Sequence, residues 1–192
     1  RRRTLSRATG IVGANTVVTG LVRSEFPSLA AESIPQFGLP VPRALAMEPH
    51  APLAIGFIGR LVPEKGLDVL LRACVRLYGA WTLTVAGTGS EQETLEALAE
   101  RLCIASRVTW LGGIPRAQHA TLWPRLDCLV APSRTTAGWV ETYPVQILEA
   151  MGHGVTVVAS DSGALPEVIG KAGLIFRDGH PEGLTEALEV VL

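Results

Sequence analysis

The chain has 192 residues, of which 47% are hydrophobic and 18% charged, so it is globular with room for one domain and part of another. Its formal net charge is −1 and its aromatic content is 5%, which favours neither a nucleic-acid partner nor a base-stacking surface. No apolar run is long enough for a membrane-spanning helix, and we expect no signal peptide. Three widely spaced cysteines without a Cys-x-x-Cys pair predict buried thiols in a cytoplasmic protein, rather than disulfides or a zinc site.

The first fifty residues predict about one β-α-β unit, which is too little to bury a core of its own. Its expected parts are a strand at 10–15, a helix at 16–26 and a short extended piece at 33–36. A cluster of helix and strand breakers then predicts a linker and a domain boundary near residue 50: Gly38, Pro40, Pro42, Pro49 and Pro52.

From residue 52 onward, short apolar runs alternate with helical periodicity about six times. The expected strands cover residues 54–58, 81–86, 108–111, 127–131, 155–159 and 174–176. The expected helices cover residues 66–77, 90–102, 118–123, 145–151, 164–169 and 181–192. Continuous apolar strands with crossover helices predict an α/β fold with a doubly wound, Rossmann-like parallel sheet. Ligands of such sheets bind at the carboxyl ends of the strands, so the residues after each strand are the candidates for function.

The first candidate motif is Gly59-Arg60 with Pro63-Glu64-Lys65-Gly66, which follows a strand and opens a helix. Arginine offers a planar fork and lysine a compact charge, and both suit phosphate oxygens. The chain has only two lysines, Lys65 and Lys171, so the choice of lysine at position 65 stands out. The alternative is an ordinary solvated loop.

The second motif runs from Glu141 to Glu149. Pro144 suits the first position of a helix, and Thr142 or Tyr143 would then cap it. The first turn, which begins at Val145, holds no carboxylate, so the positive end of the helix is left for an outside anion. The two glutamates could accept hydrogen bonds from sugar or ribose hydroxyls. The alternative is two surface glutamates without a function.

Other motifs are weaker. Gly87-Thr88-Gly89 follows a strand, but Gln92 stands where a dinucleotide fingerprint has its third glycine. The segment 160–163 with Pro166-Glu167 either faces the same cleft or forms a simple turn. Four scattered histidines and the absence of Asp-x-Asp indicate neither a bound metal ion nor another cofactor.

Residues 52–192 resemble the nucleotide-binding half of a family 4 retaining glycosyltransferase of the GT-B fold. The resemblance is carried by "GFIGRLVPEKGLDVLLRA", "VAGTGSEQETL", "RVTWLGGI", "DCLVAPS" and "ETYPVQILEAMGHGVTVVASDSGALPEVIGKAGLIF". It implies that residues 51–192 are the C-terminal domain, which binds the nucleotide-sugar donor. Because "IPQFGLPV" resembles the linker of that family, residues 1–50 are expected to be the linker and the tail of the N-terminal, acceptor-binding domain.

The resemblance also implies roles for individual residues. Arg60 and Lys65, after Gly59, match the pair that holds the donor diphosphate and stabilises it as leaving group. Glu141 matches the glutamate that meets the donor sugar, and Glu149 the one that binds ribose. The remaining matches are the amides of the phosphate loop, Thr142, Tyr143, Pro144 and Val145, and the base-side stretch 113–115 around Ile114. The family usually has Gly, Phe, Gly after the first glutamate, so Pro144 removes one amide donor.

The implied function is transfer of a hexosyl-type sugar from a nucleotide diphosphate donor to an unknown sugar, lipid or glycan acceptor. The family retains the anomeric configuration and needs no metal ion. The chain alone would be inactive, and any peripheral membrane contact would be made by the missing domain. Two alternatives stay open: a donor-binding module without transfer activity, and a dinucleotide-dependent oxidoreductase. Gln92, and the lack of an acidic residue after the strand at 108–111, argue against the second.

Overall fold

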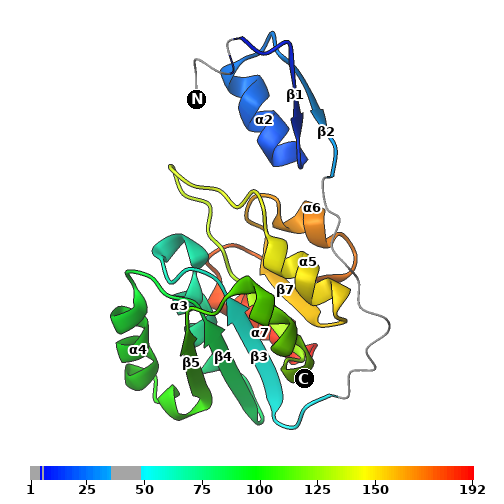
Figure 1. Cartoon of the computed structure of the whole chain (residues 1–192). Helices are drawn as coiled ribbons and strands as arrows, with labels where there is room; N and C mark the ends of the chain where they lie inside the picture. The colour runs from blue at the N-terminus through cyan, green and yellow to red at the C-terminus, as the bar shows by residue number, and fades with distance from the viewer. Residues whose placement is uncertain (1–4, 6, 36–48) are drawn as a thin grey trace.

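The computed structural model describes residue 5, residues 7–35 and residues 49–192 (Figure 1). The predicted linker breakers Gly38, Pro40 and Pro42, and residue 36 of the predicted extended piece, lie outside the described residues. In the part of the chain that is described, no helix is long and apolar enough to cross a membrane.

The N-terminal unit, residues 10–33, is one β-α-β motif. It consists of β1 (Gly10–Gly13), α2 (Thr16–Glu25) and β2 (Ala30–Ser33), with the two strands parallel. Asn15 caps α2, because its side chain accepts a hydrogen bond from the Val18 amide at 3.0 Å. The prediction of this motif is confirmed, although its second strand lies three residues earlier than the extended piece expected from residue 33.

A six-stranded parallel sheet forms the centre of the larger unit, residues 53–192. Its strands are β3 (Leu53–Ile58), β4 (Trp81–Ala86), β5 (Val108–Gly112), β6 (Cys128–Ala131), β7 (Thr156–Ser160) and β8 (Gly173–Phe176). They lie in the order β5-β4-β3-β6-β7-β8, so the strand order reverses between β3 and β6. The predicted Rossmann-like, doubly wound fold is therefore confirmed, and β3 and β6 flank its topological switch point.

Helices cover both faces of this sheet (Figure 1). One hydrophobic cluster joins the sheet to α3 (Leu67–Cys74), α4 (Gln92–Arg101) and α7 (Pro181–Glu189). A second cluster joins the opposite face to α5 (Val145–Gly152) and α6 (Leu165–Ile169). Strand β7 shows the division, because Val158 belongs to the first cluster while Val157 and Ala159 belong to the second.

Short 3₁₀ helices connect several of these elements. They are η1 (Pro63–Lys65), η2 (Ala105–Arg107), η3 (Arg116–Thr121) and η4 (Trp123–Arg125). The α-helix predicted at 118–123 is wrong, because this segment forms the two 3₁₀ helices η3 and η4 instead. Pro124 lies inside η4, near its start, where a missing N–H costs little.

The Gly-x-Gly sequence after β4 brings two loops into backbone contact. A Cβ atom on Gly87 would lie 1.8 Å from the Gly59 carbonyl oxygen, and one on Gly89 would lie 2.1 Å from that of Leu61. The Leu61 amide also donates to the Thr88 carbonyl at 2.9 Å. These glycines are therefore explained by close packing of the β3–η1 and β4–α4 loops, which fixes the backbone beside Arg60.

Candidate functional site

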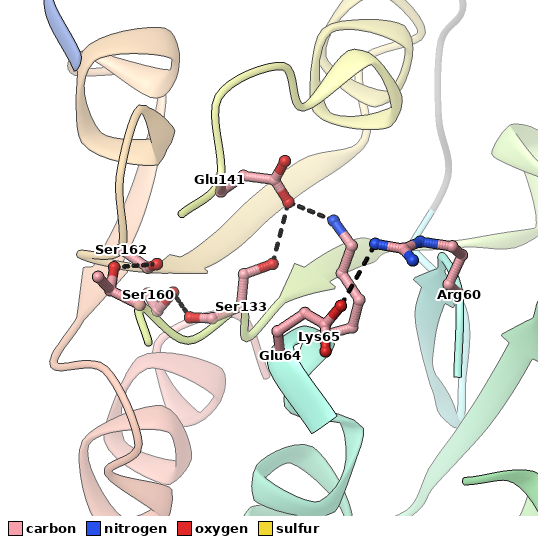
Figure 2. Close-up of polar contacts among 8 residues, drawn as sticks. Arg60, Glu64, Lys65, Ser133, Glu141, Ser160 and Ser162 are labelled. Atoms are coloured by element: carbon pink, nitrogen blue, oxygen red, sulfur yellow. Dashed lines mark hydrogen bonds and ion pairs between the residues drawn. The ribbon is translucent and has the colours of Figure 1, made fainter. Parts of the chain in front are cut away.

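Two of the predicted site residues meet at the switch point of the sheet. Lys65 ends η1, which follows β3, and Glu141 lies in the β6–α5 loop, residues 132–144. The Lys65 amine and the Glu141 carboxylate form an ion pair, drawn in Figure 2. Because β3 and β6 are neighbours in the sheet, residues 76 positions apart come into contact.

This ion pair is shielded from water. The side chain of Lys65 is 14% exposed and that of Glu141 is 7% exposed. Ser133 donates a second hydrogen bond to the same Glu141 oxygen, Oε2, at 3.2 Å. The Lys65 amine also lies 4.8 Å from the ring centre of Trp139, within cation–π range. A carboxylate this buried is stable only with such partners, so the cluster depends on the lysine charge.

Close backbone packing places both members of the pair. Gly66 has φ 66°, and a Cβ atom there would lie 2.0 Å from the Pro132 carbonyl oxygen, so only glycine allows η1 to approach the β6–α5 loop. On the other side, a Cβ atom on Gly163 would lie 2.2 Å from the Glu141 carbonyl oxygen. The Ala164 amide donates to that oxygen at 2.8 Å.

Arg60 lies on the solvent side of this cluster. Its side chain is 62% exposed and pairs with Glu64, four residues on, at 3.4 Å (Figure 2). Among the described residues, its guanidinium pairs only with Glu64, in a surface ion pair that contributes at most about 1 kcal/mol. A ligand at the edge of the Lys65–Glu141 cluster could draw Arg60 away from Glu64 at small cost.

Glu149 lies inside α5 and faces a different set of partners. Its carboxylate accepts a hydrogen bond from Arg116 Nε at 2.6 Å and lies 3.1 Å from His119 Nδ1. Its side chain is only 13% exposed. Trp123 lies next to the His119 ring, with the ring centres 6.2 Å apart. Sequence reasoning predicted Glu149 but missed Arg116 and His119, which follow the base-side stretch 113–115 in η3.

The start of α5 differs from the prediction in two ways. Pro144 precedes the helix, Val145 is its first residue, and no side chain caps it, so Thr142 and Tyr143 are not caps. The Val145 amide donates to the Tyr143 carbonyl at 3.0 Å. Pro144 has no N–H, so two of the four predicted positions do not offer a free backbone amide to a phosphate. The first turn of α5 holds no acidic residue, as expected.

The remaining predicted positions line the same end of the sheet. Gly59 follows β3, and its amide donates to the Ala86 carbonyl at 3.0 Å. Ile114 is half-buried in the loop between β5 and η3. Ser133, which sequence reasoning also missed, lies two residues after the end of β6, and its carbonyl accepts a hydrogen bond from the Ser160 hydroxyl at 2.5 Å. The rule that ligand-binding residues follow parallel strands could have identified it.

A cavity of about 710 Å³ lies at the opposite end of the sheet, beside the amino ends of strands β3, β6 and β7. Asp127 organises its wall, accepting from the amide and the ring nitrogen of His50, each at 2.9 Å, and from the Ala54 amide at 2.7 Å. These contacts fasten the segment before β3 to the start of β6, which is a structural role. Across the described residues, no group of three or more His, Cys, Asp or Glu side chains is placed to hold a metal ion.

Comparison with known proteins shows which family this chain resembles. The family described as "Glycosyl transferases group 1" matches residues 52–192. The D-inositol 3-phosphate glycosyltransferase of Mycolicibacterium smegmatis is 33% identical over 153 residues, which cover 77% of this chain and 32% of the relative. The GDP-mannose-dependent alpha-(1-6)-phosphatidylinositol monomannoside mannosyltransferase of the same organism is 34% identical over 138 residues, covering 68% and 36%.

The fold matches solved glycosyltransferases of the GT-B type. Anabaena HepE, solved with UDP and glucose, superposes with a TM-score of 0.79 at 21% identity, covering 95% of this chain and 53% of that one. By sequence, the match spans about a third of the length of the two curated relatives named above. The family match covers well over half of the chain, including β3 to α7 and the whole Lys65–Glu141 cluster. The chain belongs to the glycosyl transferases group 1 family.

Proposed function

We propose that residues 51–192 bind a nucleotide diphosphate sugar and that residues 1–50 are the linker and the tail of an acceptor-binding domain. Together with the rest of that domain, the chain would transfer a hexosyl-type sugar to an acceptor with retention of configuration and without a metal ion. The observation that carries the proposal is the buried Lys65–Glu141 pair at the switch point, with a carboxylate-free helix start beside it. We propose a cytoplasmic location.

The leaving diphosphate carries the charge that the site must stabilise. Lys65 lies at the carboxyl end of β3, and Arg60 is close by on the same connection, with a weakly held guanidinium. We assign both to the phosphate oxygens, with the N-terminus of α5 as a third source of positive potential. When Lys65 turns toward phosphate, Ser133 still donates to the Glu141 carboxylate, so that carboxylate keeps one hydrogen-bond partner.

In this proposal, Glu141 and Glu149 bind different parts of the donor. Glu141 lies in the loop before α5, next to Lys65, and we assign it to the donor sugar near the transferred carbon. Glu149 lies one turn into α5, among residues that follow the base-side stretch, and we assign it to the ribose hydroxyls. A carboxylate accepts more hydrogen bonds than the two from Arg116 and His119, so it can still accept from a hydroxyl.

The names of the relatives suggest which donors to test. One relative is named as GDP-mannose-dependent, another is named for D-inositol 3-phosphate, and a structural neighbour was solved with UDP and glucose. Calorimetry of the chain with GDP, UDP and ADP should show micromolar-range binding of at least one of them, equal in EDTA and in buffer alone. Millimolar or weaker binding of all three would contradict the proposal. A strong loss of affinity in EDTA would contradict the metal-independent part of it.

A donor-binding module without transfer activity is the second candidate, and it makes the same binding predictions. The two differ only in turnover, which needs the complete acceptor-binding domain. Joining this chain to such a domain and measuring release of nucleoside diphosphate would separate them. The oxidoreductase alternative has lost its basis, because the Gly-x-Gly turn serves loop packing and the family match is to glycosyl transferases.

A further inference from the structure

Asn15 connects the N-terminal unit to the loop that carries Glu141. Its side-chain oxygen accepts from the Val18 amide at 3.0 Å, and its side-chain nitrogen donates to the Thr142 carbonyl at 2.6 Å. Asn15 and Thr142 are 127 positions apart in the sequence. Asn15 is only 1% exposed, so both ends of one buried amide are used. The same side chain therefore caps α2 and holds the residue next to Glu141.

A second contact joins α2 to α6 beside the first. The carboxylate of Glu167 accepts a hydrogen bond from the Thr16 amide at 2.9 Å and another from the Thr16 hydroxyl. Helix α2 has no acidic residue of its own in its first turn. Glu167 thus supplies, from the other unit, the negative charge that favours the N-terminus of α2. Figure 1 shows α6 as the helix of the larger unit that lies toward the N-terminal unit.

The start of α6 is in turn fastened to Glu141. The Ala164 amide donates to the Glu141 carbonyl at 2.8 Å, and Gly163 leaves room for that carbonyl where any Cβ would clash. The three segments therefore form a closed set of contacts. Asn15 is hydrogen-bonded to Thr142, and Thr16 to Glu167 of α6. Ala164, just before α6, is hydrogen-bonded to Glu141.

We propose that Asn15 and Glu167 are positioning residues that dock the N-terminal unit on the backbone of Glu141 and Thr142. The position of this unit thereby sets the geometry of the loop at the phosphate and sugar end of the site. The effect on donor binding rests on the proposed function, whereas the docking itself does not. Neither residue touches the donor in this proposal, since each acts through the loop.

Two variants separate docking from folding. Asn15→Asp keeps an oxygen that caps α2 but removes the nitrogen that donates to Thr142. Glu167→Ala removes the carboxylate that Thr16 binds. Glu186→Ala is the matched control, because Glu186 is an exposed residue of α7. Circular dichroism should show the secondary structure of the parent in all of them, which establishes that the variants are folded.

The distance between the units reports on docking. Spin labels are attached to cysteines introduced by Leu21→Cys in α2 and Tyr78→Cys after α3. Both positions are exposed, at 53% and 85%. The exposed Cys103 is replaced by glycine, which suits its φ of 57°. We expect one narrow distance distribution in the parent and in Glu186→Ala, and a broad one in the Asn15→Asp, Glu167→Ala double variant. An unchanged narrow distribution in the folded double variant would overturn the docking role.

Nucleoside diphosphate affinity reports on the loop. We expect Asn15→Asp to weaken binding of the tightest of GDP, UDP and ADP about three- to tenfold, and Glu186→Ala to leave it unchanged. A broadened distance with unchanged affinity would overturn the link between docking and the loop. If the parent binds none of the three nucleotides, the proposed function fails, while the distance measurements still decide whether Asn15 and Glu167 dock the unit.

Discussion

Replacing Glu149 with alanine tests the assignment of the ribose site. The substitution removes a carboxylate that is only 13% exposed and, in our assignment, accepts from ribose hydroxyls. A hydrogen bond to a charged group contributes about 1.5–3 kcal/mol. Since each ~1.4 kcal/mol is tenfold in affinity, we expect plain nucleoside diphosphate to bind about ten- to a hundredfold more weakly.

A second effect of the same substitution has the opposite sign. Without Glu149, the positive charge of Arg116 is no longer neutralised and attracts the diphosphate. The side chain of Arg116 is 61% exposed, so this attraction acts through solvent and decays over about 8 Å at 0.15 M salt. The loss of the ribose contact should therefore dominate, and calorimetry at 0.05 and 0.3 M salt should show a larger loss of affinity at the higher salt.

Glu141→Ala is the matched control. It removes the partner of Lys65 and leaves the amine to the phosphates, so plain nucleoside diphosphate should bind as in the parent or more tightly. Only a sugar-bearing donor should bind more weakly. If Glu141→Ala weakens nucleoside diphosphate tenfold or more while Glu149→Ala does not, the two assignments are reversed. Unchanged binding in both variants would mean that neither glutamate belongs to the site.

Two further predictions concern packing and thiols. Gly66→Ala places a Cβ atom 2.0 Å from the Pro132 carbonyl at a φ of 66°, so we expect a loss of at least ~3 kcal/mol and a midpoint about 6–12 °C lower. Gly152→Ala, with nothing within 4 Å, should be close to neutral in the same melt. Only Cys103 should react with a thiol reagent at pH 8 in the native chain, because burial raises the pKa of Cys74 to about 12 and also raises that of Cys128. A count of two or three reactive thiols before unfolding would contradict this.

The large sheet could be predicted because its central strands, β3, β6 and β7, are buried almost throughout. Such strands are continuous apolar runs, as in Leu53–Ile58, and these runs are distinctive between helices of regular period. The strand Ala30–Ser33 was misplaced because its sequence AAES has neither an apolar run nor alternation. The 3₁₀ segments η3 and η4 were read as one α-helix because a few residues do not distinguish a spacing of three from one of 3.6.

That Lys65 and Glu141 lie at the same end of the sheet could be predicted from topology, since both residues come after strands that adjoin at the switch point, but their direct ion pair was not predicted. The partners of Glu149 could not be predicted, because Arg116 and His119 belong to a 3₁₀ segment whose direction depends on how it packs against α5. The contact between Thr16 and Glu167 spans 151 positions and depends on how the two units meet. No local pattern in the sequence encodes that arrangement.

The different surroundings of the two glutamates indicate the shape of the ligand. Glu141 lies with Lys65 before α5, whereas Glu149 lies four residues after Val145, about 6 Å along the helix axis at a rise of ~1.5 Å per residue. Glu149 pairs with residues that follow β5, and Glu141 with residues that follow β3 and β6. In our proposal the ligand contacts both groups, so we expect it to be longer than a compact anion. A nucleotide sugar has an anionic centre between a ribose and a sugar, so it is long enough to use both.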